Sequence, residues 1–188
     1  MEEITLYHFT DTIRLPWIMR SGELRPGANR IGGFPDPDFV WATTNESGDR
    51  SASGGAGKIG SQAYRAGASR LVRLKLRAED FIQWGKIGQR YPAWTPDQIA
   101  RLEAAAKGKS SSDAWWCRAD PLPRSKWVQI DTRSYAAPTW KPLDLSTEVI
   151  PGPALDSYGV IVNGRRFCSA QRAGPAGATA YMILPQDA

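Results

Sequence analysis

Two strand-like runs lie in residues 4–45, which read ITLYHFTDTIRLPWIMRSGELRPGANRIGGFPDPDFVWATTN. The first run, Ile4 to Thr10, combines β-branched and aromatic residues and contains the only histidine of the chain, His8. The second run, residues 38–43, also ends with an aromatic residue followed by polar residues. We therefore expect the segment from Trp41 to Asn45 to lie beside His8 and to line one cleft with it.

Between these runs the sequence predicts a short helix and then a loop. Asp11 and Thr12 can cap a helix, Pro16 suits a first helical turn, and Gly22 suits a helix end. The Gly- and Pro-rich residues 27–37 are typical of a loop. A short helix therefore directly follows the strand that carries the histidine.

Downstream, an alternating run and a capping pattern predict one strand and one longer helix. In residues 71–76 the leucines and the valine lie mostly on one side, so we expect Arg73 and Lys75 to form a basic outer face. Thr95, Pro96 and Gln98 match a capping box that opens a helix over residues 96–107. Further strands are expected at residues 114–118, 126–132 and 139–143, and the first two of these are expected to pair across a proline-containing turn.

The length and composition are those of a globular protein. The chain has 188 residues, of which 41% are hydrophobic, 10% aromatic and 23% charged. This length suits one domain or one domain with an appendage. From residue 144 the sequence changes to Gly, Pro and Ala with short apolar runs. We therefore predict a domain over residues 1–143 and a C-terminal extension over residues 144–188 that adds a hairpin.

Charge and cysteine content limit the partners and the compartment. The net charge of +5 modestly favours polyanions, although a solvated surface explains it equally well. No signal-like N-terminus or apolar run of about 18 residues is present, so we expect no membrane association. Two cysteines and one histidine give no disulfide framework and no zinc spacing. We expect a cytoplasmic protein without a metal site.

Common catalytic motifs are absent from the sequence. It contains no GxSxG, HExxH or paired CxxC motif, and no GxGxxG between a strand and a helix. His8 is therefore the main candidate for chemistry, although a core histidine bonded to a carbonyl is an alternative reading. Trp41 is as compatible with packing as with stacking on a ligand, and Thr10 with capping the helix.

The segment His8-Phe9-Thr10, the short helix with Pro16 and Gly22, and the run Val40-Trp41-Ala42-Thr43 resemble the first two motifs of the ADP-ribosyltransferase-like fold. The spacing is similar to the entry segment of DarT-type toxins and of tRNA 2′-phosphotransferases. The resemblance implies an α+β fold with a split, mostly antiparallel β core and a few short helices.

The resemblance also implies that the chain binds NAD through His8, Thr10, Trp41 and Thr43. A neutral imidazole can hydrogen-bond a ribose hydroxyl, and Thr10 can bond the carboxamide of NAD. The face of Trp41 can stack on nicotinamide. These four residues are the predicted NAD-binding set.

In such families an acidic residue of a third motif completes the site. It stabilises the oxocarbenium-like sugar as nicotinamide leaves and orients the acceptor. Strand order points to Asp113, although the family residue is normally glutamate. Glu148 has the right residue type but comes late in the chain. Both residues stay candidates for the catalytic acid.

The expected function is therefore NAD-dependent ADP-ribosyl transfer to a macromolecule, either nucleic acid or protein. The resemblance further implies a toxin or defence role, with an antitoxin as a further partner protein. One alternative is an RNA-processing enzyme similar to tRNA 2′-phosphotransferase, although a second catalytic histidine is absent. Another is a non-catalytic nucleic-acid or nucleotide-binding module, in which tryptophans stack on bases and Arg65, Arg73 and Lys75 meet phosphates.

Overall fold

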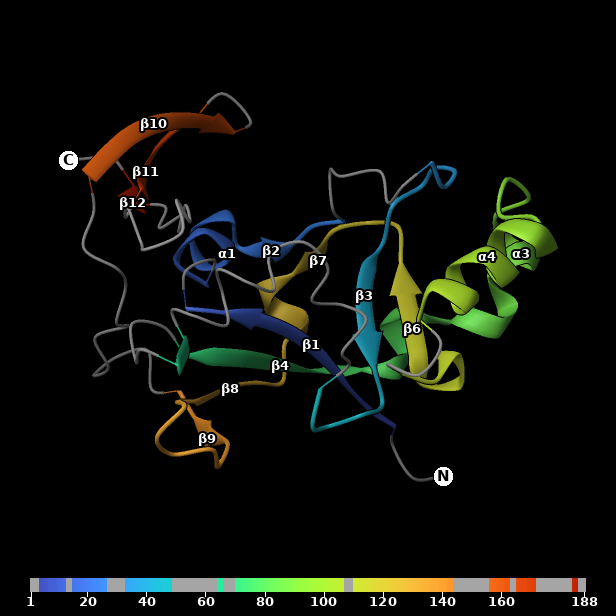
Figure 1. The fold of residues 1–188 in the computed structure, drawn as a ribbon, viewed down its shortest axis with the longest axis horizontal. Coiled ribbons are helices and arrows are strands. Elements are labelled where there is room, and N and C mark those ends of the chain that lie inside the picture. The colour runs from blue at the N-terminus through green and yellow to red at the C-terminus, as the bar shows by residue number, and fades with distance from the viewer. Residues whose placement is uncertain are drawn as a thin grey trace. The chain divides into compact units, whose positions relative to one another are not determined.

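The described part of the chain has an α+β architecture made mostly of antiparallel strands with a few short helices (Figure 1). In this computed structural model the described residues are 4–12, 15–26, 33–48, 64–65, 70–106 and 110–143, together with the strands 156–162, 165–171 and 184–185. The strand pairs whose register is described are all antiparallel. These features confirm the predicted fold class at this level.

Seven strands form the largest sheet, in the order β5-β6-β3-β1-β4-β8-β9. The strand that carries His8 therefore lies between the strand that carries Trp41 and the alternating strand of residues 71–77. The strands are β1 (Thr5–Asp11), β3 (Val40–Thr43), β4 (Leu71–Arg77), β5 (Ile82–Gln83), β6 (Trp115–Arg118), β8 (Gln129–Arg133) and β9 (Lys141–Pro142).

The helices in the described part of the chain are short, and the longest of them is the one that the capping pattern predicts. Thr95 Oγ1 accepts a hydrogen bond from the backbone N–H of Gln98 at 3.4 Å, which confirms the start of this helix. The helices whose bounds are described are α1 (Leu15–Ser21), α3 (Ile87–Arg90) and α4 (Pro96–Ala106), with 3₁₀ turns η1 (Ala78–Asp80), η2 (Trp84–Lys86), η3 (Ser112–Ala114) and η4 (Arg124–Lys126).

The chain divides into two compact units, one of residues 1–9, 23–53 and 74–129 and the other of residues 10–22, 54–73 and 130–188. The first unit has an aromatic core, in which α3 and α4 pack beside β6 (Figure 1). Stacked, tilted and edge-to-face ring contacts hold this core together, as expected for aromatic clusters. Its buried members are Phe34, Phe39, Trp84, Ile87, Trp94, Ala106, Trp115 and Cys117.

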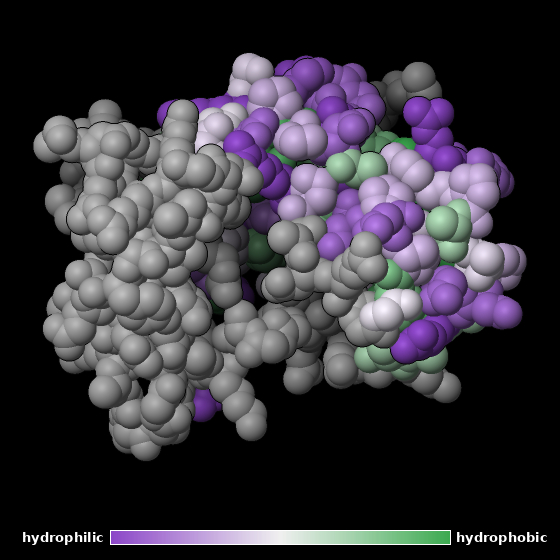
Figure 2. Space-filling view, turned by 90° about the horizontal axis from the view of Figure 1, so that it is seen from above, coloured by the Kyte–Doolittle hydropathy of each residue, from purple (hydrophilic) through white to green (hydrophobic). Residues whose placement is uncertain are grey.

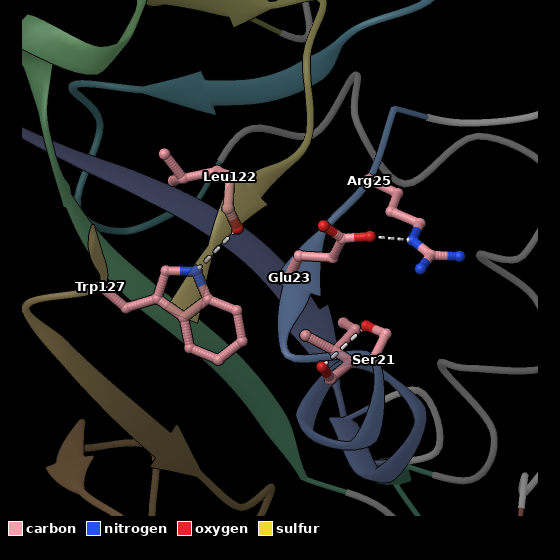
Figure 3. A network of polar contacts seen from close by, with 6 residues as sticks. Ser21, Glu23, Arg25, Leu122 and Trp127 are labelled. Atoms are coloured by element: carbon pink, nitrogen blue, oxygen red, sulfur yellow. Dashed lines mark hydrogen bonds and ion pairs between the residues drawn. The ribbon is translucent and has the colours of Figure 1, made fainter. Parts of the chain in front are cut away.

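A second, two-stranded sheet in the first unit joins β2 (Glu23–Leu24) to β7 (Leu122–Pro123). Leu24 and Leu122 are buried, and the indole N–H of Trp127 donates to the carbonyl of Leu122 at 3.3 Å (Figure 3). The predicted pairing of residues 114–118 with 126–132 is wrong. Strand β6 lies between β5 and β3, whereas β8 lies between β4 and β9, because the proline-containing turn forms β7 and pairs with β2.

In the second unit, a buried ion pair joins β4 to β8. Arg73 Nε lies 2.8 Å from Asp131 Oδ2, and the two side chains are 7% and 2% exposed. The predicted basic outer face is therefore wrong for Arg73. Its charge is neutralised by Asp131, and its guanidinium is covered by the ring of Trp140, at 4.7 Å from the ring centroid. Lys75 is half-buried.

Residues beyond 143 contribute a hairpin and one further short strand. Strands β10 (Asp156–Val162) and β11 (Arg165–Gln171) pair along their whole length, and β12 (Leu184–Pro185) adds to β11. The boundary at residue 143 stays a prediction.

The described surface in Figure 2 is mostly hydrophilic, and its hydrophobic residues form small separate patches. Among the residues whose exposure is described, the large hydrophobic ones exposed to solvent are Ile4, Val128 and Tyr135. Within the described ranges, no helix combines the length and the apolar character needed to span a bilayer.

Candidate functional site

His8 lies in the middle of β1, on the same face of the sheet as Leu6 and Thr10. Successive side chains of a strand point to opposite faces, so Tyr7 and Phe9 lie on the other face. Leu6 is fully buried, whereas His8 and Thr10 are half-buried. Along this face of β1 a buried apolar residue is therefore followed by two half-buried polar residues.

A backbone hydrogen bond fixes the imidazole of His8. Its Nδ1 lies 2.8 Å from the carbonyl oxygen of Trp41. Because a carbonyl oxygen only accepts, Nδ1 carries the hydrogen, which leaves Nε2 as an acceptor in the neutral ring. Burial of the ring lowers the pKa of His8 below its ordinary value of 6.5, and the bond to Trp41 opposes this only in part. The imidazole is therefore neutral at pH 7.

Strand pairing separates Trp41 and Thr43 from His8 and Thr10. Directly paired residues share a face, and Tyr7 pairs with Thr43, which in turn pairs with Trp115. Trp41 lies on this same face. Its ring packs in the aromatic core, 5.2 Å from Trp84 and 5.6 Å from Phe39 between ring centroids. The structure thus brings Trp41 next to His8 through its backbone but does not gather the four predicted residues on one face.

Trp116 is the aromatic residue that shares the face of His8. Tyr7, Thr43 and Trp115 share one face through their direct pairings, and side chains alternate along each strand, so His8 and Trp116 lie on the opposite face. Strand β3 lies between their two strands, which are therefore roughly 10 Å apart. Trp116 is half-buried. Sequence reasoning missed it, although the pair Trp115-Trp116 at the start of a strand must send one ring to each face.

Asp113 lies in η3, immediately before β6, and its side chain is exposed. The hydroxyl of Ser111 donates to Asp113 Oδ2 at 3.3 Å. The backbone N–H of Thr44 donates to the carbonyl oxygen of Ala114 at 3.0 Å. Asp113 therefore lies next to the C-terminal end of β3, where its pairing with β6 ends. The alternative acid, Glu148, lies outside the described residues.

The turn after β3 is held by its own side chains. The side-chain NH₂ group of Asn45 donates to the backbone carbonyl of Gly48 at 2.7 Å. The side-chain oxygen of Asn45 accepts a hydrogen bond from the backbone N–H of Ser47. Gly48 has φ +113°, and a side chain there would be strained and would contact the ring of Phe9. Tyr7 donates to Glu46 at 3.4 Å. These contacts hold residues 45–48 in place directly after β3, next to the strand β1.

Other catalytic chemistry has little support in the described residues. They contain no group of three or more His, Cys, Asp or Glu side chains placed to hold a metal ion. Burial raises the pKa of Cys117 to about 12, and its thiol faces the carbonyl of Ile82 at 3.6 Å. Cys117 is therefore a packed core residue and not a thiolate nucleophile.

Comparison of the chain with protein-family models, with curated proteins and with solved structures finds no match.

The neutral state of His8 predicts a pH dependence of stability. In the unfolded chain His8 takes up a proton near pH 6.5, whereas in the folded chain it does so only at lower pH. The unfolded state therefore binds more protons in this window, so the contribution is complete above pH 6.5 and is lost as the pH falls. We expect His8→Phe to weaken the decline in unfolding free energy between about pH 7.5 and 5. Urea titrations of both proteins at several pH values measure the unfolding free energy. Parallel declines in the two proteins would contradict the lowered pKa of His8.

Proposed function

We propose that this protein binds NAD and transfers its ADP-ribose group to a macromolecular acceptor. One observation carries the proposal most directly: a neutral imidazole, fixed by Trp41, lies on a sheet face that also holds Trp116. A locked Nε2 acceptor and an aromatic ring together suit a ligand that offers ribose hydroxyls and a flat ring. The resemblance of the His8-Phe9-Thr10 segment to ADP-ribosyltransferases gives the same ligand.

Each residue of this face has a proposed role. Nε2 of His8 accepts a hydrogen bond from a ribose hydroxyl, and the hydroxyl of Thr10 bonds the carboxamide of NAD. Trp116 stacks on the nicotinamide ring, in place of Trp41, whose ring is packed in the core. Thr43 is 3% exposed, and its hydroxyl accepts a hydrogen bond from the backbone N–H of Asn45. Its proposed role is therefore to stabilise the turn after β3.

The proposed reaction exchanges one bond to the ribose carbon C1′. The C1′–N bond breaks, nicotinamide leaves with the electron pair, and an acceptor atom forms the new bond to C1′ as it loses a proton. A carboxylate stabilises the cationic sugar and takes that proton. Asp113 and Glu148 are the candidates for this carboxylate. The cytoplasmic location and an antitoxin partner stay predictions that accompany this proposal.

The test is transfer of label from adenine-labelled NAD to a mixture of DNA, RNA and protein. The wild type is compared with Asp113→Asn and Glu148→Gln, which keep the size of each side chain and remove its charge. Transfer by the wild type, with loss in one of the two variants, supports the proposal and identifies the acid. Neither label transfer nor nicotinamide release by the wild type would contradict it.

The role of Trp116 gives a separate prediction. If its ring stacks on nicotinamide, Trp116→Leu raises the KM for NAD by about three- to tenfold, the usual worth of an aromatic contact. Trp116→Phe keeps a ring and is expected to change KM by less than about twofold. Steady-state nicotinamide release measures both variants. An equal effect of leucine and phenylalanine would show that only side-chain volume matters at this position.

A further inference from the structure

An open hollow of about 460 Å³ lies in the first unit, next to the short helix α3. The residues that line it are Ile82, Lys86, Gln89 and Arg90. The three polar residues are exposed, and Ile82 is half-buried. The volume is within the range of ligand sites in proteins. The lining offers two positive charges, one amide and one apolar surface, and it contains no carboxylate.

The backbone that carries these side chains is well packed. Trp84 and Ile87, which belong to the aromatic core, are 1% and 0% exposed and anchor η2 and α3. Gly88 lies close to the chain that leads into α4, since a Cβ there would be 3.2 Å from the carbonyl oxygen of Trp94. The positions of the residues around the hollow are therefore fixed by the core beneath them.

The two cations of the hollow are not neutralised by the protein. Among the described residues, neither Lys86 nor Arg90 has an ion-pair partner. Other cations of this unit are paired: Lys126 Nζ, for example, lies 3.1 Å from Asp80 Oδ1. The hollow therefore presents two positive charges that an anionic group from outside can meet.

The spacing of the two cations suits an extended peptide. Lys86 directly precedes α3 and Arg90 is the last residue of that helix, so about one helical turn, roughly 6 Å, separates them. In an extended chain, side chains two residues apart lie on the same side at roughly 6–7 Å from each other. Side chains of adjacent residues point to opposite sides. Two carboxylates separated by one residue can therefore meet both cations at once.

The hollow also lies at an edge of the largest sheet. Strand β5, which carries Ile82, is the last strand on that side, and β6 is its one neighbour among the described strands. The outer side of an edge strand presents backbone N–H and C=O groups that can pair with an extended segment of another chain. An extended ligand beside Ile82 therefore has backbone groups within reach in addition to the side chains of the hollow.

We propose that this hollow binds an extended acidic segment of a partner protein, with two carboxylates, separated by one residue, on Lys86 and Arg90. The side-chain NH₂ group of Gln89 donates to a carbonyl of the segment, and Ile82 contacts the methylene groups of a glutamate. These two contacts favour a peptide over a simple anion. The inference does not rest on the proposed NAD reaction, which uses other residues.

The test is fluorescence anisotropy of the full-length protein, without NAD and at low ionic strength, with three short labelled peptides. One carries two glutamates separated by one residue. The second has the same composition with the glutamates adjacent, and the third has glutamines at the positions of the first. The protein variants are Lys86→Gln and Arg90→Gln. Arg124→Gln is the matched control, because Arg124 is exposed and has no ion-pair partner among the described residues but does not line the hollow.

We expect Lys86→Gln and Arg90→Gln each to weaken binding of the first peptide by about three- to fivefold, the usual worth of one exposed ion pair. Arg124→Gln should weaken it by less than about 1.5-fold. The peptide with adjacent glutamates should bind at least about threefold more weakly, and the glutamine peptide at least about tenfold more weakly. Circular dichroism verifies that each variant is folded.

Four results would overturn the inference. They are no binding of the first peptide by the wild type, equal affinity for the two glutamate peptides, an equal loss in Arg124→Gln, and displacement of the peptide by inorganic phosphate as readily as by unlabelled peptide. The last result would show a site for simple anions. His8→Ala is expected to bind the first peptide as the wild type does, so failure of this site and failure of the NAD reaction are separate results.

Discussion

Replacing Asp131 with alanine is expected to lower the free energy of unfolding by about 3–5 kcal/mol. The change leaves Arg73 buried without the carboxylate that lies 2.8 Å from its Nε. With a side chain only 7% exposed, Arg73 cannot replace the lost carboxylate by hydration, so less of its desolvation cost is offset. Urea unfolding of the two proteins at pH 7 measures the difference.

Two control variants separate this effect from loss of charge in general. Arg73→Met combined with Asp131→Leu removes both charges and is expected to cost less than Asp131→Ala alone. Glu79→Ala breaks the exposed pair of Arg77 with Glu79, whose atoms are 3.8 Å apart, and is expected to cost less than about 1 kcal/mol. A loss below about 1 kcal/mol in Asp131→Ala would show that the pair does not hold β4 to β8.

Replacing His8 with alanine is expected to lower the rate of nicotinamide release from NAD by about 100-fold. The variant removes the Nε2 acceptor and also the ring that bonds the carbonyl of Trp41. Both losses leave the ribose less well placed, and small errors of placement cost large factors in rate. The wild-type profile of kcat/KM should fall on the acid side, below pH 6.5, because only the neutral ring has an acceptor.

Trp41→Phe is the matched control for His8→Ala. It keeps the backbone carbonyl that His8 uses and changes only a ring of the aromatic core. We expect it to destabilise the protein while keeping most of the nicotinamide release per folded molecule. If His8→Ala keeps more than about half of the wild-type rate, or if Trp41→Phe loses as much as His8→Ala, the role given to His8 is wrong.

Local sequence patterns predicted most of the elements in the described part of the chain. The apolar runs that contain His8 and Trp41 are strands β1 and β3, and Thr95 begins the longest helix. These predictions needed only alternation and capping, which act over a few residues. The strand at residues 71–77 was predicted for the same reason.

Features that depend on strand register were not predicted. A shift of one residue in register sends every side chain to the other face, and a single strand does not reveal its register. For this reason Trp41 was expected beside His8 in a cleft, although its ring lies in the core, and Trp116 was overlooked. Likewise, the buried state of Arg73 depends on Asp131, a residue far along the chain, which alternation within β4 cannot indicate.

Calorimetric titration of the purified protein with NAD tests the central proposal most directly. We expect the wild type to bind one NAD per chain, and His8→Gln, which keeps a polar side chain but lacks the imidazole Nε2, to bind it at least about tenfold more weakly. The same ligand should raise the unfolding temperature of the wild type more than that of the variant. Absence of binding heat and of any thermal shift in the wild type would contradict the proposal that His8 holds NAD.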